Sequence, residues 1–329
     1  MSQQDGSVRA GVRKRVTLLV MLAAAASLWA APSRAEDYPV RRVTIVAPVP
    51  PGGPMDYAAR MMARALERRW HQSVIVENRP GAGALLGAEV VAHAPPDGYT
   101  LLIHNTSIAA YPVFEKTDFR FTKDLAAVST IMQSPWLLFA SSEMPGSLNG
   151  IIKFAKDNPN KLNIGVIPNS FQQLRTFKFL KLSGISGTMI PYPGTAPVQM
   201  ALLADQLQLY MASPFGMEKL VSEGKIRAIV ALAEQPYWGM PDVPTAAAAG
   251  IPFVVGERYY LLAPAKTPAP VIDQLAAAVA DAVADPQVAG QIKATGYEPY
   301  AESPAEVTRE LTALQDEAVD LAQQANITK

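Results

Sequence analysis

The residues best suited to chemistry in this sequence form a short glycine-proline run. Gly52 and Gly53 lie between an apolar, β-branched stretch, Val43–Val49, and a stretch beyond Asp56 whose apolar residues have helical spacing. The first N–H groups of a helix have no partner inside it and form the positive end of its dipole, and glycines let a ligand approach the backbone closely. The run therefore predicts a carboxylate or phosphate site, with candidate contacts Pro50, Pro51, Gly52, Gly53, Pro54, Met55 and Asp56.

Two roles fit Asp56 in this corner. As the helix cap it would use up backbone donors, whereas facing a ligand it would accept a hydrogen bond from an amine or hydroxyl. The run is not a phosphate-binding P-loop, because no Lys-Ser or Lys-Thr pair follows the glycines. Its spacing also differs from that of a dinucleotide-binding fingerprint.

A second set of polar side chains follows the apolar stretch Tyr99–His104. Asn105, Thr106 and Ser107 come directly after this predicted strand. Ligands of open α/β sheets bind at the ends of strands, but the same residue types also cap helices and turns. The sequence leaves both interpretations open.

The sequence contains no recognisable catalytic constellation. It has no G-x-S-x-G elbow, no H-E-x-x-H pair and no cysteine, and its three histidines are His71, His93 and His104. His104 ends a strand near the proposed site and is the one histidine worth testing, but no nucleophile or metal partner accompanies it. We expect no catalytic residues, no metal site and no cofactor.

The first 35 residues have the composition of a secretory leader. Basic residues from Arg9 to Arg15 precede the apolar run Val16–Ala31, and Ser33–Ala35 is a small-x-small cleavage pattern. A membrane anchor is the alternative, but the run is short for a bilayer span and Pro32 follows it at once. We expect residues 1–35 to be removed and the mature chain to be exported.

Charge and cysteine content narrow the function further. The whole chain has 29 basic and 29 acidic residues, and removing five basic and one acidic residue with the leader leaves a net charge of −4. Such a surface has no electrostatic footprint for nucleic acid or an anionic membrane. With no cysteine, disulfides and thiolate ligands are excluded, and the fold must be stabilised by core burial.

Alternating strand and helix patterns fill most of the chain and predict an α/β protein. The strongest boundary signals are Asp285-Pro286 and the capping box that begins at Ser303 and starts a helix to Gln324. Ser147 is a candidate cap for a helix Leu148–Asp157. Other local predictions are a helix Ala84–His93 with Leu86, Val90 and Val91 inside, a helix through Leu182 with Leu174 and Phe177 inside, a surface excursion over Tyr111–Asp124, and an alanine-rich helix between Pro241 and Gly250.

Several runs resemble successive motifs of one receptor family. VIVENRPGAGALLGAEVVAHAPPDGYTLL (74–102), PYPGTAP (191–197) and MPDVPTAAAAG (240–250) look like those of the Bug family, the periplasmic solute receptors of tripartite tricarboxylate transporters. The resemblance covers nearly the whole mature chain in the right order. It implies a ligand carboxylate held by backbone groups and ordered water at two turns of the first lobe, which here are Pro50–Asp56 and Asn105–Ser107.

The same resemblance implies a fold, a location and partners. The expected fold is a two-lobed, type II periplasmic-binding-protein-like structure, each lobe a mostly parallel sheet flanked by helices, with the ligand cleft between lobes. We expect residues 36–135 and 257–329 in the first lobe and 136–256 in the second. The protein would be a periplasmic monomer that serves the membrane subunits of such a transporter or, alternatively, a sensor kinase.

Departures from the family pattern bear on the ligand. They lie at Pro168–Leu174, Tyr192–Gly194, Gln208 and Glu257–Tyr260, so the candidate contacts of the second wall are Asn169, Ser170, Phe171, Tyr192, Thr195 and Arg258. Alternation puts Arg258 and Tyr260 on one face and Tyr259 on the other. Arg258 could bind a second carboxylate and Phe171 could pack on a planar ring, which predicts an elongated or aromatic ligand, including a dicarboxylate, in preference to a small amino acid. The alternative is that these side chains belong to the core or surface.

Overall fold

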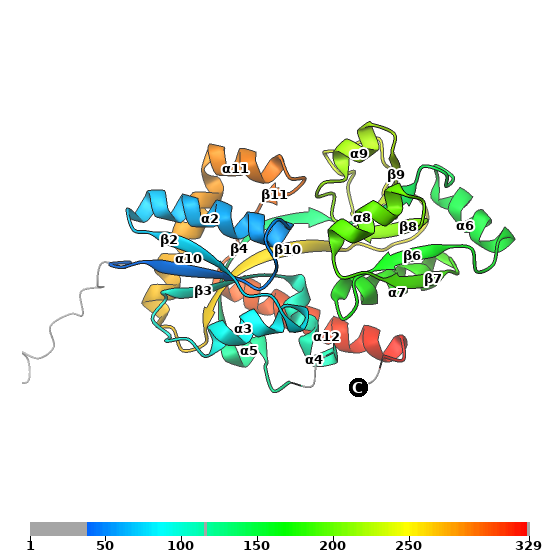
Figure 1. Cartoon of the computed structure of the whole chain (residues 1–329). Coiled ribbons are helices and arrows are strands. Elements are labelled where there is room, and N and C mark those ends of the chain that lie inside the picture. Colours follow the sequence, from blue (N-terminus) through cyan, green and yellow to red (C-terminus); the bar gives the residue numbers. More distant parts are fainter. Residues whose placement is uncertain (1–37, 115–116, 328–329) are drawn as a thin grey trace, which may run out of the picture. The chain divides into compact units, whose positions relative to one another are not determined.

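The chain folds around two β-sheets, each covered by helices (Figure 1). The structure is a computed structural model that describes residues 38–114 and 117–327. The predicted leader, residues 1–35, lies outside the described residues. Within the part of the chain that is described, no helix combines the length and apolar character needed to cross a membrane.

The first sheet has six strands in the order β11-β4-β10-β3-β1-β2. Their bounds are β1 Val43–Ala47, β2 Val74–Asn78, β3 Thr100–Asn105, β4 Leu125–Pro135, β10 Gly256–Pro264 and β11 Glu298–Pro299. β1 is parallel to both β2 and β3, whereas β10 is antiparallel to β3 and β4. The carboxyl ends of β1 and β3 and the first residues of β10 therefore meet at one edge.

Helices cover both faces of this first sheet (Figure 1). α2 and α10 pack against each other on one face, while α3 and α12 contribute to one hydrophobic cluster on the other. The elements of this lobe are α2 Pro54–Trp70, the 3₁₀ turn η1 Ala82–Ala84, α3 Leu85–Ala92, the 3₁₀ turn η2 Thr106–Ala110, α4 Tyr111–Phe114, α5 Phe121–Asp124, α10 Ala269–Ala284, α11 Pro286–Lys293 and α12 Pro304–Gln324.

The second sheet has five strands in the order β7-β6-β8-β5-β9. Their bounds are β5 Leu137–Ser141, β6 Asn163–Val166, β7 Thr188–Pro191, β8 Leu209–Ala212 and β9 Ile226–Ala231. Residues of α6 (Leu148–Asp157) and α7 (Phe171–Ser183) pack in one cluster, and α8 (Thr195–Leu203) packs in another with the residue before α9 (Glu218–Ser222). The predicted two-lobed α/β fold is confirmed, but each sheet is mixed rather than mostly parallel, because β5 and β10 run antiparallel to their neighbours.

Two segments connect the sheets side by side. β4 passes into β5 through Trp136, and the chain returns after β9 through residues 232–255 to β10. Trp136 N–H donates to Val255 O (3.0 Å) and Leu232 N–H donates to Trp136 O (2.8 Å), so the two crossings are hydrogen-bonded to one another. The lobe boundaries at residues 135/136 and 256/257 stay a prediction.

The helix starts predicted at Ser147, Asp285 and Ser303 are confirmed. Ser147 accepts from Gly150 N–H at the start of α6, and Asp285 accepts from the N–H groups of Gln287 and Val288 at the start of α11. Ser303 and Glu306 form a complete capping box, and α12 ends at the predicted Gln324. Local cap chemistry is enough to place these boundaries because its partners lie within three residues.

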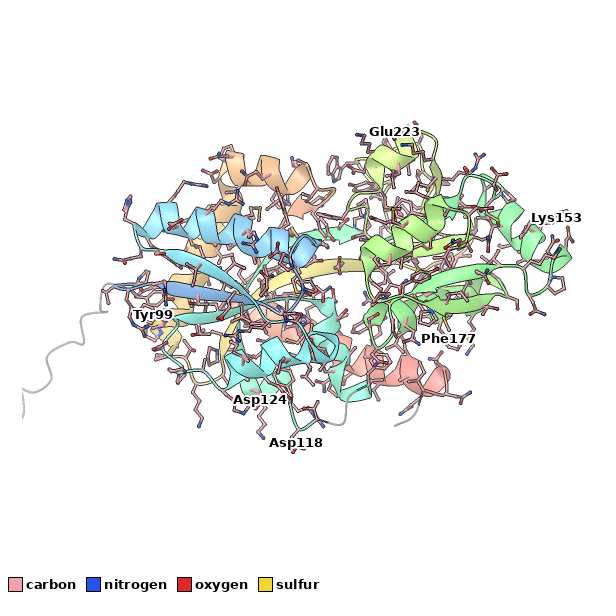
Figure 2. The ribbon with its side chains drawn as sticks, viewed as in Figure 1. Tyr99, Asp118, Asp124, Lys153, Phe177 and Glu223 are labelled. Atoms are coloured by element: carbon pink, nitrogen blue, oxygen red, sulfur yellow. The ribbon has the colours of Figure 1, made fainter. Side chains whose placement is uncertain are left out.

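Two predicted inner faces are wrong in part. In α3 the exposed fractions of Leu86 and Val90 are 48% and 41%, while Val91 is buried as predicted. The cause is close packing at Gly87, where an added Cβ would lie 2.7 Å from Pro48 Cβ, so the small-residue side of α3 faces the sheet. In α7 Leu174 is buried as predicted, but Phe177 is only partly buried (Figure 2).

Two loop predictions are also wrong. The segment Tyr111–Asp124 is not a surface excursion, because Tyr111, Val113, Phe119 and Phe121 are buried in the first lobe's core. The alanine-rich stretch after Pro241 forms turns instead of a helix. Its backbone bonds to the second sheet: Ala246 N–H donates to Ala231 O, and Ala231 N–H donates to Pro244 O.

Candidate functional site

The glycine-proline run forms a sharp turn between β1 and α2. Gly52 has a φ of 100°, a conformation that favours glycine, and Gly53 is the extended residue at the N-cap of α2, with Pro54 at the first helical position. A Cβ added at Gly52 or Gly53 would have no heavy atom within 4 Å. Both glycines therefore border open space rather than neighbouring side chains.

Asp56 holds this turn in shape through a saturated hydrogen-bond network. Its Oδ1 accepts from Asn78 Nδ2 (2.9 Å) and pairs with Arg60 Nη2 (2.9 Å), and its Oδ2 accepts from Gly52 N–H (3.1 Å) and Arg60 Nε (3.0 Å). Burial alone would raise the pKa of this carboxyl, but the hydrogen bonds from Arg60, Asn78 and Gly52 outweigh it and lower the pKa. Each oxygen already has two donors.

The structure thus contradicts the first of the two interpretations of Asp56, in which it caps the helix. Asp56 lies inside α2, at its third position, and the cap is Gly53, which makes no side-chain bond. The predicted direct ligand contact also conflicts with the saturated carboxylate. The side chain instead fixes the path of the backbone that precedes the helix.

The start of α2 keeps free backbone donors. Tyr57 N–H donates to Gly53 O as the first helical bond, and Pro54 has no N–H. Among the described residues, the N–H groups of Gly53, Met55 and Asp56 have no hydrogen-bond partner. These donors, at the positive end of a 17-residue helix, form an arrangement that accepts an anion.

Most polar groups of the second predicted turn, Asn105–Ser107, already have hydrogen-bond partners within the protein. Asn105 is the N-cap of η2, its Oδ1 accepting from Ser107 N–H (3.1 Å), and its Nδ2 donates to Glu257 Oε1 (2.6 Å). Thr106 Oγ1 accepts from Arg258 N–H (3.1 Å). The capping interpretation of Asn105 is confirmed, and the Ser107 hydroxyl is the group of this turn that no described residue engages.

His104 belongs to the core rather than to a reactive site. Its side chain is buried, with Nε2 2.6 Å from Tyr111 Oη and Nδ1 near the backbone of Asn105. Burial lowers the pKa of the imidazole to about 4, so the ring is neutral at physiological pH. The ring packs edge-on against Tyr111 instead of facing solvent.

The candidate residues of the second lobe fall into two groups. Ser170 caps α7, and exposed Asn169 precedes it with a φ of 55°. Thr195 begins α8 and hydrogen-bonds to Tyr210, while Tyr192 packs partly buried against the core of the second lobe. Asn169 and Thr195 keep exposed surface, whereas the Ser170 hydroxyl is already hydrogen-bonded as the N-cap of α7.

Phe171 does not form an aromatic wall in this structure. It is fully buried and packs with Leu174 and Tyr260 in the cluster that includes α12. The guanidinium of Arg175 lies over its ring at 4.5 Å, and that guanidinium also pairs with Glu317 in α12 (2.8 Å). This burial agrees with the alternative prediction that Phe171 belongs to the core, and it conflicts with a role as a wall for a planar ring, because α7 docks on α12 through this side chain.

Arg258 also has partners that the sequence did not indicate. Its Nη1 lies 2.8 Å from Glu310 Oε1 and 3.4 Å from Glu302 Oε2, its Nε donates to Gln133 Oε1, and its guanidinium lies over the Tyr300 ring at 4.8 Å. Two carboxylates neutralise its charge. The predicted grip on a second ligand carboxylate therefore conflicts with this network.

Sequence reasoning passed over Glu257, the residue before Arg258. Its Oε1 accepts from Asn105 and its Oε2 accepts from Tyr297 Oη (2.6 Å). Burial raises the pKa of this carboxyl, although hydrogen bonds from Tyr297, Asn105, Tyr259 and Ser213 oppose that effect. The departure from the family pattern at residues 257–260 is the sequence signal that indicates Glu257, although the contact predicted there was its neighbour Arg258.

The fold and the anion-accepting helix start together define a two-lobed solute-binding protein. The model of the tripartite tricarboxylate transporter family receptor matches residues 58–324, and the chain belongs to this family. The predicted Bug-family resemblance is confirmed as well. Protein BugT of Bordetella pertussis is 30% identical over 281 residues, covering 84% of this chain and 86% of BugT.

Solved structures agree with this assignment. MatC from Rhodopseudomonas palustris with bound malate is 30% identical, with a TM-score of 0.77, covering 86% of this chain and 99% of MatC. Rpa4515 of R. palustris with adipate is 28% identical, with a TM-score of 0.81, covering 88% of this chain and 98% of that protein. Both are structures of the same fold with a carboxylate bound.

Proposed function

We propose that this protein is a periplasmic receptor that binds a small organic carboxylate and presents it to the membrane subunits of a tripartite tricarboxylate-type transporter. It binds its ligand as a monomer, in one-to-one stoichiometry, without converting it. The periplasmic location follows from the predicted leader together with the family. The ligand's carboxylate is received at the turn between β1 and α2.

The observation that carries this proposal is the set of unpartnered donors at the start of α2. The N–H groups of Gly53, Met55 and Asp56 need an acceptor, and a carboxylate supplies oxygens and a negative charge together. Gly53 borders open space, so a ligand oxygen has access to the backbone. Asp56 does not repel the ligand strongly, because Arg60 neutralises it.

Two relatives of known structure support the carboxylate class. MatC was solved with malate and Rpa4515 with adipate, and both ligands carry carboxylates at each end of a short chain. The shared feature is the carboxylate itself, since the carbon chains differ in length and in hydroxyl content. We carry only that shared feature over to this protein.

A ligand screen on residues 36–329 tests the proposal. Mono-, di- and tricarboxylates are compared by thermal shift, and ligands that raise Tm are measured by calorimetry, because a ligand that binds only the native state raises Tm with its concentration. The matched control is the neutral amide of the best ligand, which lacks the charge that the helix start accepts. Equal binding of the amide, no Tm shift with any carboxylate, or product detected by NMR would contradict the proposal.

Delivery to the transporter is tested separately. Uptake of the best ligand is compared in cells with and without the gene for this protein, with the transporter's membrane subunits present. Ligand binding in vitro without any effect on uptake would leave the receptor role intact and refute the transport role.

A further inference from the structure

Glu257 occupies the same edge of the first sheet as the anion-accepting turn. In the pairing of β10 with β3, Tyr259 lies opposite Asn105, so Glu257 lies two residues beyond the end of β3. The strand order places β3 between β10 and β1. Two interstrand spacings, about 10 Å, therefore separate the strand that carries Glu257 from the strand that leads into Gly52 and Gly53.

Neutral donors surround the Glu257 carboxylate. Asn105 Nδ2 and Tyr297 Oη each approach one oxygen at 2.6 Å, and Tyr297 Oη also lies 2.8 Å from Ser213 Oγ of the second lobe. Tyr259 bonds to the same carboxylate. Burial raises the pKa of Tyr259 and Tyr297 well above the ordinary value, so both phenols stay protonated and act as donors.

No cation balances this carboxylate. In the described part of the chain, no Lys, Arg or His nitrogen lies within 4.0 Å of a Glu257 oxygen. The neighbouring Arg258 directs its guanidinium to Glu302 and Glu310 instead. A partly buried anion without a cation is unfavourable, since neutral hydrogen bonds offset only part of the lost hydration.

Glu257 nevertheless keeps part of its surface exposed. Glu257, Asn105 and Ser213 are each partly exposed, whereas the rings of Tyr259 and Tyr297 behind them are almost completely buried. The tyrosines thus lie on the buried side of this cluster, and Glu257, Asn105 and Ser213 are its partly exposed residues.

We propose that Glu257 is a specificity-determining residue that binds a protonated amine of the ligand, so that the protein selects amino-substituted carboxylates. This inference rests on the proposed function, in which the start of α2 binds the ligand's carboxylate. The ammonium supplies the cation that Glu257 lacks, and the two charged ends of one ligand complement two separate groups on the same sheet edge. An unsubstituted dicarboxylate would bring its second negative charge toward Glu257 and would be disfavoured.

Matched ligand pairs test this inference. Propionate is compared with β-alanine, butyrate with γ-aminobutyrate, and glutarate with glutamate, by calorimetry on the native protein. In at least one pair we expect the amino form to bind about 10- to 100-fold more tightly, the range for a hydrogen bond to a charged group. Glu257→Gln keeps the shape but removes the charge, and it should reduce that preference to less than about threefold.

Glu234→Gln is the control variant, because it removes one exposed acidic charge and should leave the preference unchanged. Unsubstituted carboxylates that bind as well as the amino forms to the native protein would overturn the inference and leave the proposed function standing. The same holds if Glu257→Gln folds and keeps the full preference. Binding of none of these carboxylates, in a protein that also fails the wider screen, would refute the proposed function itself.

Discussion

Asp56 and Glu257 are both carboxylates with several hydrogen-bond donors at one edge of the first sheet, yet their surroundings have opposite effects. Asp56 receives four contacts, two of them from the cation Arg60, and the pKa of its carboxyl is lowered. Glu257 receives hydrogen bonds from neutral groups alone, and burial raises the pKa of its carboxyl. The number of donors is similar; the presence of a cation differs.

The comparison separates a carboxylate that shapes the site from one that remains available to a ligand. Asp56 has no remaining charge to satisfy, and its bond to Gly52 N–H fixes the turn that leaves the next donors free. Glu257 has no compensating charge within the described protein, and it keeps exposed surface. Substitutions of Asp56 should therefore change the stability and shape of the turn, whereas substitutions of Glu257 should change ligand selectivity.

The largest effect on ligand binding is expected from blocking the free N–H groups at the start of α2. Gly53→Val places two methyl groups over the free N–H groups, and we expect carboxylate binding to fall by at least about 100-fold, the loss of two or more charge-assisted hydrogen bonds. The fold should survive, because Gly53 is extended and a Cβ there meets no atom within 4 Å. Calorimetry measures the binding and circular dichroism the fold.

The control for this variant is Gly290→Val, since Gly290 in α11 also has no atom within 4 Å of an added Cβ. Normal affinity in Gly53→Val would show that the ligand carboxylate is held elsewhere.

The next effect concerns the stability of the Asp56 corner. Asp56→Asn removes the charge that Arg60 neutralises and one acceptor from a saturated network, so we expect the free energy of unfolding to fall by about 1–3 kcal/mol. Affinity should fall with it, because the single amide oxygen of asparagine cannot accept on both sides of the network that fixes the turn. Urea denaturation and calorimetry on the same samples give both quantities.

The matched control is Asp281→Asn, which removes an exposed ion pair with Arg69 and should change stability by less than about 1 kcal/mol. Lost affinity with unchanged stability in Asp56→Asn would identify a direct ligand contact instead of a structural one.

The sequence was sufficient where the determining contacts are local. The caps at Ser147, Asp285 and Ser303 form hydrogen bonds within three residues. The order of strand, glycines and helix at the first turn could likewise be predicted from adjacent residues. It was insufficient where distant segments meet. Neither the docking of Phe171 on α12 nor the pairing of Arg258 with Glu310 follows from residue types, because both depend on where the last helix packs.

The third prediction sharpens the comparison through opposite pH dependences. The folded-state pKa of Asp56 lies below its ordinary value of 3.8, so its stabilisation is complete above that value and is lost as pH falls through the folded pKa. The folded-state pKa of Glu257 lies above its ordinary value of 4.5, so its contribution to stability decreases as pH rises from there through the folded pKa.

The two opposite pH dependences are tested by measuring the free energy of unfolding, without ligand, at acidic pH values on both sides of the ordinary carboxyl pKa values. The native protein is compared with Asp56→Asn and Glu257→Gln. On acidification the advantage of the native protein over Asp56→Asn should shrink, while its stability relative to Glu257→Gln should increase. If both stability differences, native protein minus variant, changed in the same direction with pH, the two carboxylates would not differ in the way described.

The smallest effect on binding is expected at Arg258, which lies next to Glu257 but faces other partners. Its guanidinium pairs with Glu310 and Glu302, and its side chain is 29% exposed. Solvent screening limits the value of such pairs, so Arg258→Ala should lower the free energy of unfolding by only about 1 kcal/mol. Because the Nη1 and Nε groups of that guanidinium already have protein partners, affinity for the best carboxylate should change by less than about threefold.

Arg258→Lys serves as the control, since it keeps the charge beside Glu310 while losing the planar group over Tyr300. Calorimetry of the native protein and both variants with the same ligand decides the point. A tenfold loss of affinity in Arg258→Ala at unchanged stability would mean that the guanidinium leaves Glu302 and Glu310 to meet the ligand. The positive charge beside Glu257 would then be the protein's own, and the ligand would not need to supply it.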